Sequence, residues 1–353
     1  MTAAEPATRM HADDLPYITA PLAGIGGEIK VEPEHFVVEE IPLYEASGQG
    51  QHLYVCITRS GLTTRTVVRE LCKIFDLREM DVGCAGRKDK HARTTQTFSL
   101  NMPTADVKTV ARQIEENLPV DIEWLRRHRN KLRVGHLLGN RFRIILLNPE
   151  REALSRAQDI ATELQARGLP NFYGPQRFGS CGDNALKGRE ILITGKRPAK
   201  RWVNRLLLRA YQSALFNTWL VVRIDRGWFE RVLTGDVAKK RDTGGLFEVE
   251  DTAAEQHRFE SNEITYTGPI YGSRMWWAGG RPGELEREVL ERAGVTEEML
   301  SREHLKGSRR RARLLLEDLE LRAHPDGLLF SFSLPKGAYA TTVLREFRKA
   351  AAG

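Results

Sequence analysis

Hydrophobic residues follow two different spacings along the first part of the chain. Apolar and β-branched residues alternate or cluster over 29–41, 52–59 and 95–100, which predicts three strands. From Thr63 or Thr64 onward the apolar residues recur at i, i+4, and either threonine can cap the helix that this spacing predicts. The first third of the chain is therefore predicted to hold both strands and helices.

The elements predicted further along do not alternate regularly. They are helices over 103–118, 151–167, 202–223, 284–293 and 342–350, and strands over 141–147 and 330–334. This irregular mixture favours an α+β fold with a mixed or antiparallel sheet over a Rossmann or barrel fold. Gly/Pro pairs punctuate the chain after residue 197, which predicts an inserted domain over 197–310. The first domain then spans 21–196 and 311–353, after a loose leader at 1–20.

Positive charge is concentrated in three segments of the 353-residue chain. Lys and Arg outnumber Asp and Glu by 54 to 47, a small excess that would mean little if it were spread evenly. The three runs lie within 126–143, 187–209 and 306–313. A single run is often a solvated face, but three runs indicate a phosphate-bearing partner.

The remaining composition narrows the class of protein. The four cysteines, Cys56, Cys72, Cys84 and Cys181, form no Cys-x-x-Cys pair, so we expect neither a zinc site nor a disulfide framework. The N-terminal segment has no apolar core, and no 18-residue apolar run occurs. We therefore expect a cytoplasmic protein that does not enter a membrane.

The segment Gly86–Ala92, with Arg93 after it, places one carboxylate, Asp89, among five basic side chains. A carboxylate repels phosphate, but one held ionised by nearby cations suits chemistry at an electron-poor sugar carbon. The alternative is a charged surface turn. We expect this segment in the loop or strand end before the strand at 95–100, a suitable place for a catalytic group.

Two further segments combine rings, amides and turns. Asn171–Gly179 carries two amides, an arginine and three aromatic rings, which suits an exposed base held by stacking worth about 1 to 3 kcal/mol per ring. Its alternative is an aromatic plug in the core. Leu334–Glu346 is a Pro/Gly turn that enters a helix with Tyr339 at its mouth, and alone it would read as an ordinary junction.

Together the three segments closely resemble the TruD family of tRNA pseudouridine synthases. The matching patterns are Gly-x-Lys-Asp-Lys-x-Ala-x-Thr-x-Gln, Asn-x-x-Gly-x-Gln-Arg-Phe-Gly and Pro-x-Gly-x-Tyr-Ala-Thr with Leu-Arg-Glu. Supporting matches include Lys30 with Pro33-Glu34-x-Phe36, Gly139-Asn140, and Ser213-Ala-Leu-Phe-Asn217. The resemblance runs in order from about Gly27 to Phe347.

The resemblance implies isomerisation of uridine to pseudouridine in tRNA, typically at position 13, without cofactor or metal. It also implies a catalytic domain with a mixed, mainly antiparallel sheet flanked by helices, and an inserted α/β TRUD domain opposite it across a basic cleft. Asp89 matches the catalytic aspartate and Lys30 the lysine that pairs with it. Phe36, Asn171 and Tyr339 match positions that line the uridine pocket.

We extend the expected substrate-binding set to Tyr173, Gln176 and Arg177. Contacts with the RNA backbone are expected from Lys88, Lys90, Arg129, Lys131 and Arg133. The partner is tRNA, and we expect a monomer that needs no small-molecule cofactor.

An ionised Asp89 could add to C1′, stabilise its oxocarbenium character or remove the C2′ proton, and the sequence does not choose among these. Two rival classes share some of these features. A catalytically silent RNA-binding or chaperone protein explains the basic runs but not the lone carboxylate. A nucleoside or glycoside hydrolase would use a carboxylate at C1′ but should release free base, and no carboxylate lies beside Asp89 in its own segment to form the pair such an enzyme uses.

Overall fold

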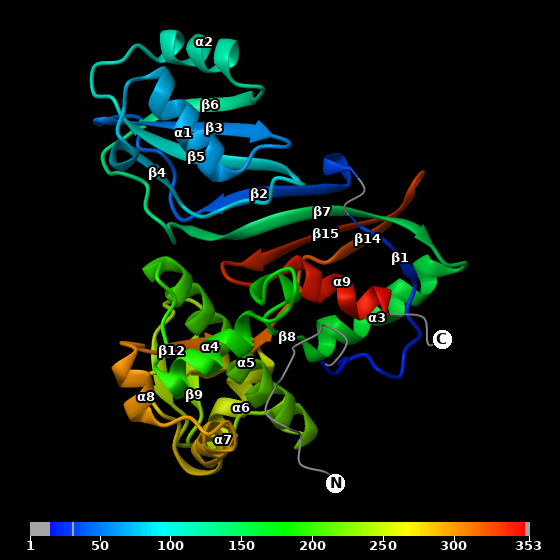
Figure 1. Ribbon diagram of the computed structural model, residues 1–353. Helices are drawn as coiled ribbons and strands as arrows, with labels where there is room; N and C mark the ends of the chain where they lie inside the picture. The colour runs from blue at the N-terminus through cyan, green and yellow to red at the C-terminus, as the bar shows by residue number, and fades with distance from the viewer. Residues whose placement is uncertain (1–14, 30–31, 350–353) are drawn as a thin grey trace. The chain divides into compact units, whose positions relative to one another are not determined.

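The computed structural model describes residues 15–29 and 32–349, which form two compact units (Figure 1). The sheet unit consists of Leu22–Thr162, Leu316–Ala340 and Phe347–Gly353. The helical unit consists of Glu163–Leu315 and Thr341–Glu346, with the N-terminal residues up to Pro21. The domain limits predicted from the sequence, with an insertion over 197–310, are a separate division of the chain and stay a prediction.

A nine-stranded sheet forms the sheet unit, in the order β14-β15-β7-β2-β5-β3-β6, with β1 beside β7 and β4 beside β5. Its strands are β1 (Gly26–Glu28), β2 (Phe36–Pro42), β3 (His52–Arg59), β4 (Val82–Cys84), β5 (Arg93–Asn101), β6 (Asp121–His128), β7 (Leu137–Pro149), β14 (Glu320–His324) and β15 (Gly327–Pro335). Only the β2–β5 pair is parallel; the other pairs are antiparallel. The structure confirms the predicted mixed, mainly antiparallel sheet.

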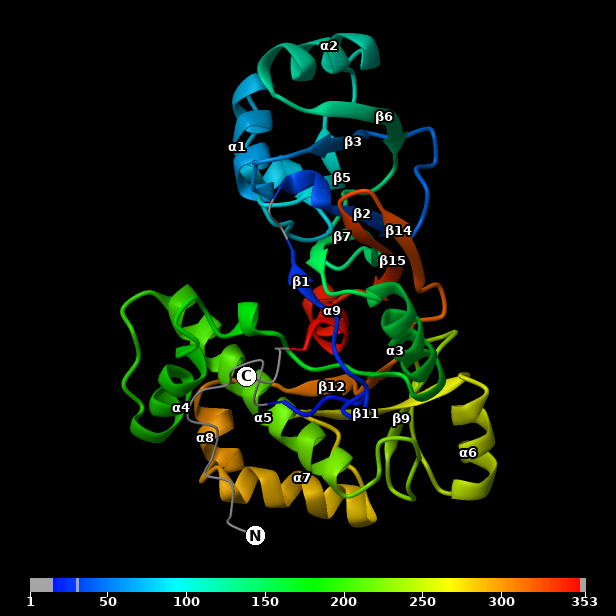
Figure 2. The same ribbon diagram turned by 90° about the vertical axis from the view of Figure 1, so that its right-hand side faces the viewer.

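Two helices, α1 (Thr64–Ile74) and α2 (Val107–Asn117), pack on the β3 and β5 end of this sheet (Figure 2). Their apolar sides meet the inward residues of the two strands in one buried cluster, as the i, i+4 spacing predicted. Thr63 caps α1 by accepting a hydrogen bond from the Thr66 amide at 3.0 Å. The second helix begins at Val107 rather than at Pro103, because Asp106 accepts from the Thr109 amide and supplies the cap.

The helices α3 (Ala153–Arg167) and α9 (Ala340–Arg348) each contribute residues to both units. Within the sheet unit, the Phe347 ring of α9 packs edge-on against Phe330 of β15, with centroids 4.9 Å apart. The Phe347 carbonyl also accepts a hydrogen bond from the Ile25 amide at 2.8 Å. Gly168, with φ 82°, follows α3 and ends it, as predicted.

The helical unit is built around α5 (Arg201–Asp225), which carries a long buried side. The other elements are α4 (Asn184–Thr194), α6 (Thr252–Glu260), α7 (Gly280–Arg292), α8 (Glu297–Arg302), a four-stranded sheet of β9 (Val237–Lys240), β10 (Leu246–Glu248), β11 (Ile264–Ile270) and β12 (Ser308–Arg311), and the pair β8 (Leu169–Pro170) and β13 (Arg313–Leu314). Arg223 of α5 and Asp236 form a fully buried ion pair at 2.7 Å. The guanidinium of Arg223 also lies 3.7 Å from the Tyr266 ring centroid, so the buried charge has a second favourable contact.

Two sequence predictions were wrong in detail. The strand predicted over 29–41 starts only at Phe36, because Pro33–His35 forms a short 3-10 turn in front of it. Between 237 and 311 the spacing predicted only a helix over 284–293, but the region also contains a sheet whose strands have three to seven residues. In the part of the chain described, no helix is long and apolar enough to cross a membrane.

Candidate active site

Asp89 lies in an irregular loop between β4 and β5, directly before the strand, as predicted. Its side chain is exposed. Its Oδ1 atom accepts a hydrogen bond from the His91 amide at 3.1 Å, a local turn that holds the carboxylate in one orientation on the loop. The loop thus presents a carboxylate to solvent from a fixed backbone.

The backbone of this loop is held from below by a buried ion pair. Lys88 Nζ lies 2.8 Å from Glu40 Oε1 of β2, and both side chains are 6% exposed. The same ammonium donates to Asn140 Oδ1 of β7 at 2.7 Å, and the Lys88 amide donates to Thr64 Oγ1 at 2.8 Å. Lys88, the residue before Asp89, is therefore bound to β2, to β7 and to the start of α1.

Gln96 of β5 completes the network under the loop. Its amide nitrogen donates to the Gly86 carbonyl at 2.9 Å and to Glu40 at 3.0 Å. Its amide oxygen accepts from Arg59 at 2.8 Å and from Thr64 at 2.9 Å. The conformation of the loop is thus set by buried and part-buried hydrogen bonds, which are costly to leave half made.

Desolvation has the largest effect on the pKa values of the two cations in this network, Lys88 and Arg59. Burial lowers the pKa of the Lys88 ammonium below its usual range, although the adjacent Glu40 carboxylate opposes this shift. Burial also lowers the pKa of Arg59 to about 10, again against the attraction of Glu40. Removing both cations from water costs free energy that the ion pair offsets only in part. The arrangement therefore serves to position the loop more than to stabilise the fold.

The turn that carries Tyr339 is anchored near the start of β7, where Lys88 also binds. Pro335 of β15 pairs with Gly139, and the Lys336 amide donates to the Leu138 carbonyl at 3.0 Å. Since Lys88 binds the next residue of β7, Asn140, the Asp89 loop and the Tyr339 turn are fixed at neighbouring positions on one strand. Two of the three sequence segments are therefore anchored to neighbouring residues of β7 within the sheet unit.

Phe36 begins β2 and is 5% exposed, with its ring packed edge-on against Phe142 at 6.3 Å. Lys30, predicted as the partner of Asp89, lies outside the described residues. Among the residues that are described, no three His, Cys, Asp or Glu side chains lie close enough to hold a metal ion.

The segment Asn171–Gly179 lies in the helical unit, where Arg310 holds its first residue. Asn171 is 4% exposed; its side chain donates to the Arg311 carbonyl at 2.7 Å and accepts from Arg310 at 2.7 Å. The third basic run thus reaches back to this segment. The Asn171 amide group is engaged by the protein, which fixes the backbone that leads to Tyr173.

Asn217 of α5 holds the backbone of Tyr173 at two points. Its side chain accepts from the Tyr173 amide at 2.8 Å and donates to the Tyr173 carbonyl at 3.0 Å. The Tyr173 ring is half-buried and lies under the guanidinium of Arg310, 3.9 Å from the ring centroid. Arg177 donates to Ser213 at 2.9 Å, while Gln176 is exposed. The segment therefore carries the Tyr173 ring and the polar side chains of Gln176 and Arg177, and Asn217 holds its backbone at Tyr173.

Four of the five cations predicted to contact RNA do not share the environment of Lys88. Lys90, Arg129 and Arg133 are exposed, and Lys131 is half-buried with its ammonium 2.5 Å from the Met80 carbonyl. The Lys88 ammonium is enclosed with Glu40 and Asn140, which argues against the predicted contact between Lys88 and the RNA backbone.

Several positioning residues were missed from the sequence. Glu40 was not singled out, although a charged residue inside the apolar strand 36–42 was a signal that could have been followed. Thr64 was named only as a possible helix cap. Arg310 was assigned only to a basic run. Its contact with Asn171 spans 139 positions of the chain, and no local pattern reports such a distance.

Comparison with protein families gives one match that spans the chain. Residues 14–199 and 197–347 match the family described as tRNA pseudouridine synthase D (TruD). A tRNA pseudouridine synthase D from Anaeromyxobacter dehalogenans is 45% identical over 346 residues, covering 96% of this chain and 97% of that protein. One from Thermus thermophilus is 42% identical over 337 residues, covering 95% and 92%.

The fold has a counterpart among solved structures. A crystal structure assigned to tRNA pseudouridine synthase D (TruD) from Methanosarcina mazei superposes with a TM-score of 0.75 at 26% identity. The alignment covers 95% of this chain and 96% of that one.

Proposed function

The chain belongs to the tRNA pseudouridine synthase D (TruD) family, and on that premise we propose that it isomerises uridine 13 of tRNA with Asp89 as the catalytic carboxylate. The enzyme class and a tRNA substrate follow from the family. The position of the uridine and the role of Asp89 are the proposed part, together with action as a monomer in the cytoplasm without a cofactor.

The observation that carries this proposal is the way the Asp89 loop is built. The motif divides into residues that hold the loop and an exposed carboxylate at its tip. The Gly86 carbonyl is bound by the buried Gln96 amide, and the enclosed Lys88 ammonium is bound by Glu40. An ordinary charged surface turn gives no reason for such a buried support. A catalytic group does, because its position relative to the reacting carbon must be kept within a fraction of an ångström.

The reaction needs the N1–C1′ bond to break and a C5–C1′ bond to form. In one route an Asp89 oxygen bonds to C1′ as uracil leaves with the N1 electron pair; C5 then attacks C1′ and returns the electron pair to the carboxylate. Loss of the C5 proton and protonation of N1 complete the isomerisation, so no redox partner is consumed. In another route Asp89 removes the C2′ proton, and in both routes it must be ionised.

Other residues have proposed supporting roles. Lys30 is the proposed cation beside Asp89, since the Lys88 ammonium is committed to Glu40. Phe36 and Tyr339 are proposed to contact the uracil ring. Asn171, Tyr173, Gln176 and Arg177 are proposed to contact the RNA, by ring stacking and hydrogen bonds to base edges or phosphate. Because Asp89 is exposed in the free protein, RNA binding would have to supply the exclusion of water around it.

The direct test uses the purified protein and unmodified tRNA transcripts that carry uridine at position 13. Chemical labelling of pseudouridine should detect product at that position and none in a transcript with cytidine there. Free uracil in the supernatant would indicate a hydrolase instead. Binding without any product on a panel of tRNAs would favour the RNA-binding alternative and contradict the proposal.

A further inference from the structure

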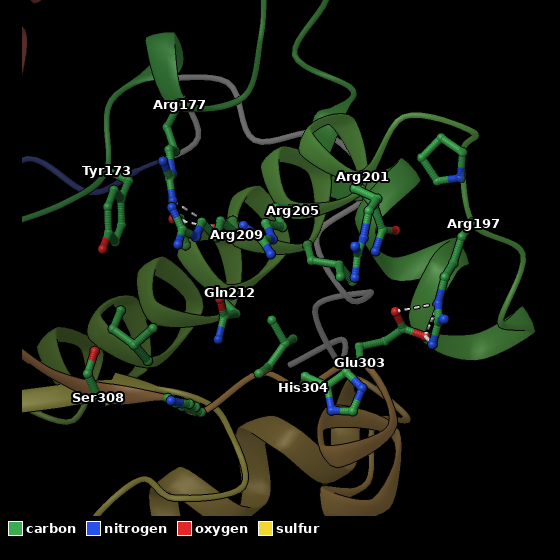
Figure 3. Close-up of a pocket in the computed structure, with 18 residues that line it drawn as sticks. Tyr173, Arg177, Arg197, Arg201, Arg205, Arg209, Gln212, Glu303, His304 and Ser308 are labelled. Atoms are coloured by element: carbon green, nitrogen blue, oxygen red, sulfur yellow. Dashed lines mark hydrogen bonds and ion pairs between the residues drawn. The ribbon is translucent and has the colours of Figure 1, made fainter. Parts of the chain in front are cut away.

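The helical unit contains a cavity of about 720 Å³ whose walls are strongly cationic (Figure 3). Its basic lining residues are Arg177, Arg197, Arg201, Arg205, Arg209 and Lys306. Glu303 is the one acid among the lining residues, and Arg197 already binds it at 3.0 Å. The cavity therefore offers an excess of positive charge to whatever enters it.

Three of these arginines form a row along one side of α5. Arg201, Arg205 and Arg209 are exposed and stand at i, i+4 and i+8, so successive members are separated by about 6 Å along the helix axis. Figure 3 shows the row along the helix, between Arg197 at one end and Tyr173 with Arg177 at the other. We call these three residues the α5 arginine row.

The α5 arginine row is unfavourable for the free protein. Within the described chain no carboxylate forms an ion pair with any of its three members, and the first turn of α5 has no acidic residue. Like charges one turn apart repel, and the amino end of a helix is itself partly positive. An anion in the cavity would relieve both effects, and guanidinium groups bind phosphate through paired hydrogen bonds.

The row is also joined to the segment proposed to contact RNA. The Arg209 carbonyl accepts hydrogen bonds from Arg177 at 3.3 Å and from Ser213 at 2.8 Å, and Ser213 in turn holds Arg177. Tyr173 and Arg177 line the same cavity. A strand with a nucleotide at Tyr173 would therefore have its neighbouring phosphates beside the row.

We propose that the α5 arginine row binds consecutive phosphates of the tRNA strand whose nucleotide contacts the Asn171–Gly179 segment. The inference rests on the proposed function for its choice of RNA. The two steps of the row span about 12 Å along the axis, which suits a polymer of regularly spaced phosphates better than one small anion. Phosphate contacts of this kind place the strand without reading its sequence.

The test compares two triple variants of the full chain. The row variant carries Arg201→Gln, Arg205→Gln and Arg209→Gln, and the control carries Arg231→Gln, Arg281→Gln and Arg292→Gln. The control residues are exposed arginines of the same unit that do not line the cavity. Affinity for unmodified tRNA is measured by filter binding across a range of salt concentrations.

The row variant should raise the Kd about 10- to 100-fold and reduce the slope of log K against log salt by about 2, since each phosphate contact contributes roughly 0.7 to 0.9. The control should change the Kd by no more than about twofold. The row variant should also melt at the same or a higher temperature than the parent, because repulsion along α5 is removed.

Equal losses in the two variants would overturn the proposal. So would unchanged tRNA affinity in the row variant, and a parallel titration with tripolyphosphate would then show whether the cavity is a small-polyanion site. Product formation by the parent protein is scored separately by pseudouridine labelling. A parent that binds tRNA through the row but makes no pseudouridine would contradict the proposed function while leaving this inference intact.

Discussion

Replacing Lys88 with methionine separates two roles for this residue, support of the Asp89 loop and contact with phosphate. At 2.8 Å and an effective dielectric constant near 20, the attraction between Lys88 and Glu40 is about 6 kcal/mol before desolvation is subtracted. The lowered pKa of Lys88 means that desolvation exceeds the attraction for this group. Lys88→Met leaves Glu40 buried without its cation, and we expect the free energy of unfolding to fall by about 3 to 5 kcal/mol.

The double variant Lys88→Met/Glu40→Gln removes the stranded charge as well as its partner. We expect urea denaturation to show a coupling of about 2 kcal/mol, so that the double variant loses less stability than the two single variants together. Lys90→Met is the matched control, because this neighbouring lysine is exposed. It should leave stability unchanged and reduce the salt slope of tRNA binding by about 1. Additive losses, or a Lys88→Met protein that keeps its stability and loses salt dependence, would refute the positioning role.

Three further predictions follow from single features of the sheet unit. Burial, with smaller effects of neighbouring charges, lowers the pKa of His52, so the unfolded chain binds a proton at this residue more readily than the folded one. The free energy of unfolding should therefore fall as the pH drops below about 6.5. For this group the fall is at most about 1.4 kcal/mol per pH unit. Urea denaturation at several pH values should show a flatter decline for His52→Gln, and an unchanged decline would exclude the assignment. Gly139→Ala would place its Cβ 2.1 Å from a β15 carbonyl and should lower the free energy of unfolding by about 2 kcal/mol. Gly86→Ala is the control, because a Cβ there meets no atom within 4 Å. Equal stabilities of the two variants would count against this packing. Arg129→Gln with Arg133→Gln should weaken tRNA binding and reduce its salt slope by about 2, and an unchanged slope would place both side chains off the RNA-binding face.

Much of the fold could be predicted from local spacing alone. The start of α1 was located correctly because a threonine cap precedes its i, i+4 apolar spacing. The helix predicted over 202–223 agrees with α5 to within two residues at each end. The short strands β9 to β12 could not be predicted in this way. β9, β10 and β12 have only three or four residues, too few for an alternating pattern to be distinguished from a loop. β11 has seven residues, but its Gly268-Pro269 pair is typical of a turn.

The candidate site shows a similar limit for a different reason. Asp89 stands out in the sequence because it is the one carboxylate in a cationic loop. The sequence could not show that Lys88 has an enclosed side chain while Lys90 is exposed, since both are lysines next to Asp89. Lys88 is buried only because Glu40 and Asn140, 48 and 52 positions away, converge on it through the pairing of β2 with β7.

The role of Asp89 is tested most directly by Asp89→Asn, which keeps the shape of the side chain and removes its negative charge. Pseudouridine formation is followed by tritium release from tRNA labelled at C5 of uridine, beside Asp326→Asn as an exposed-carboxylate control in the same unit. The account predicts no detectable release by Asp89→Asn, tRNA affinity close to that of the parent, and normal release by the control. Normal release by Asp89→Asn would contradict the central claim.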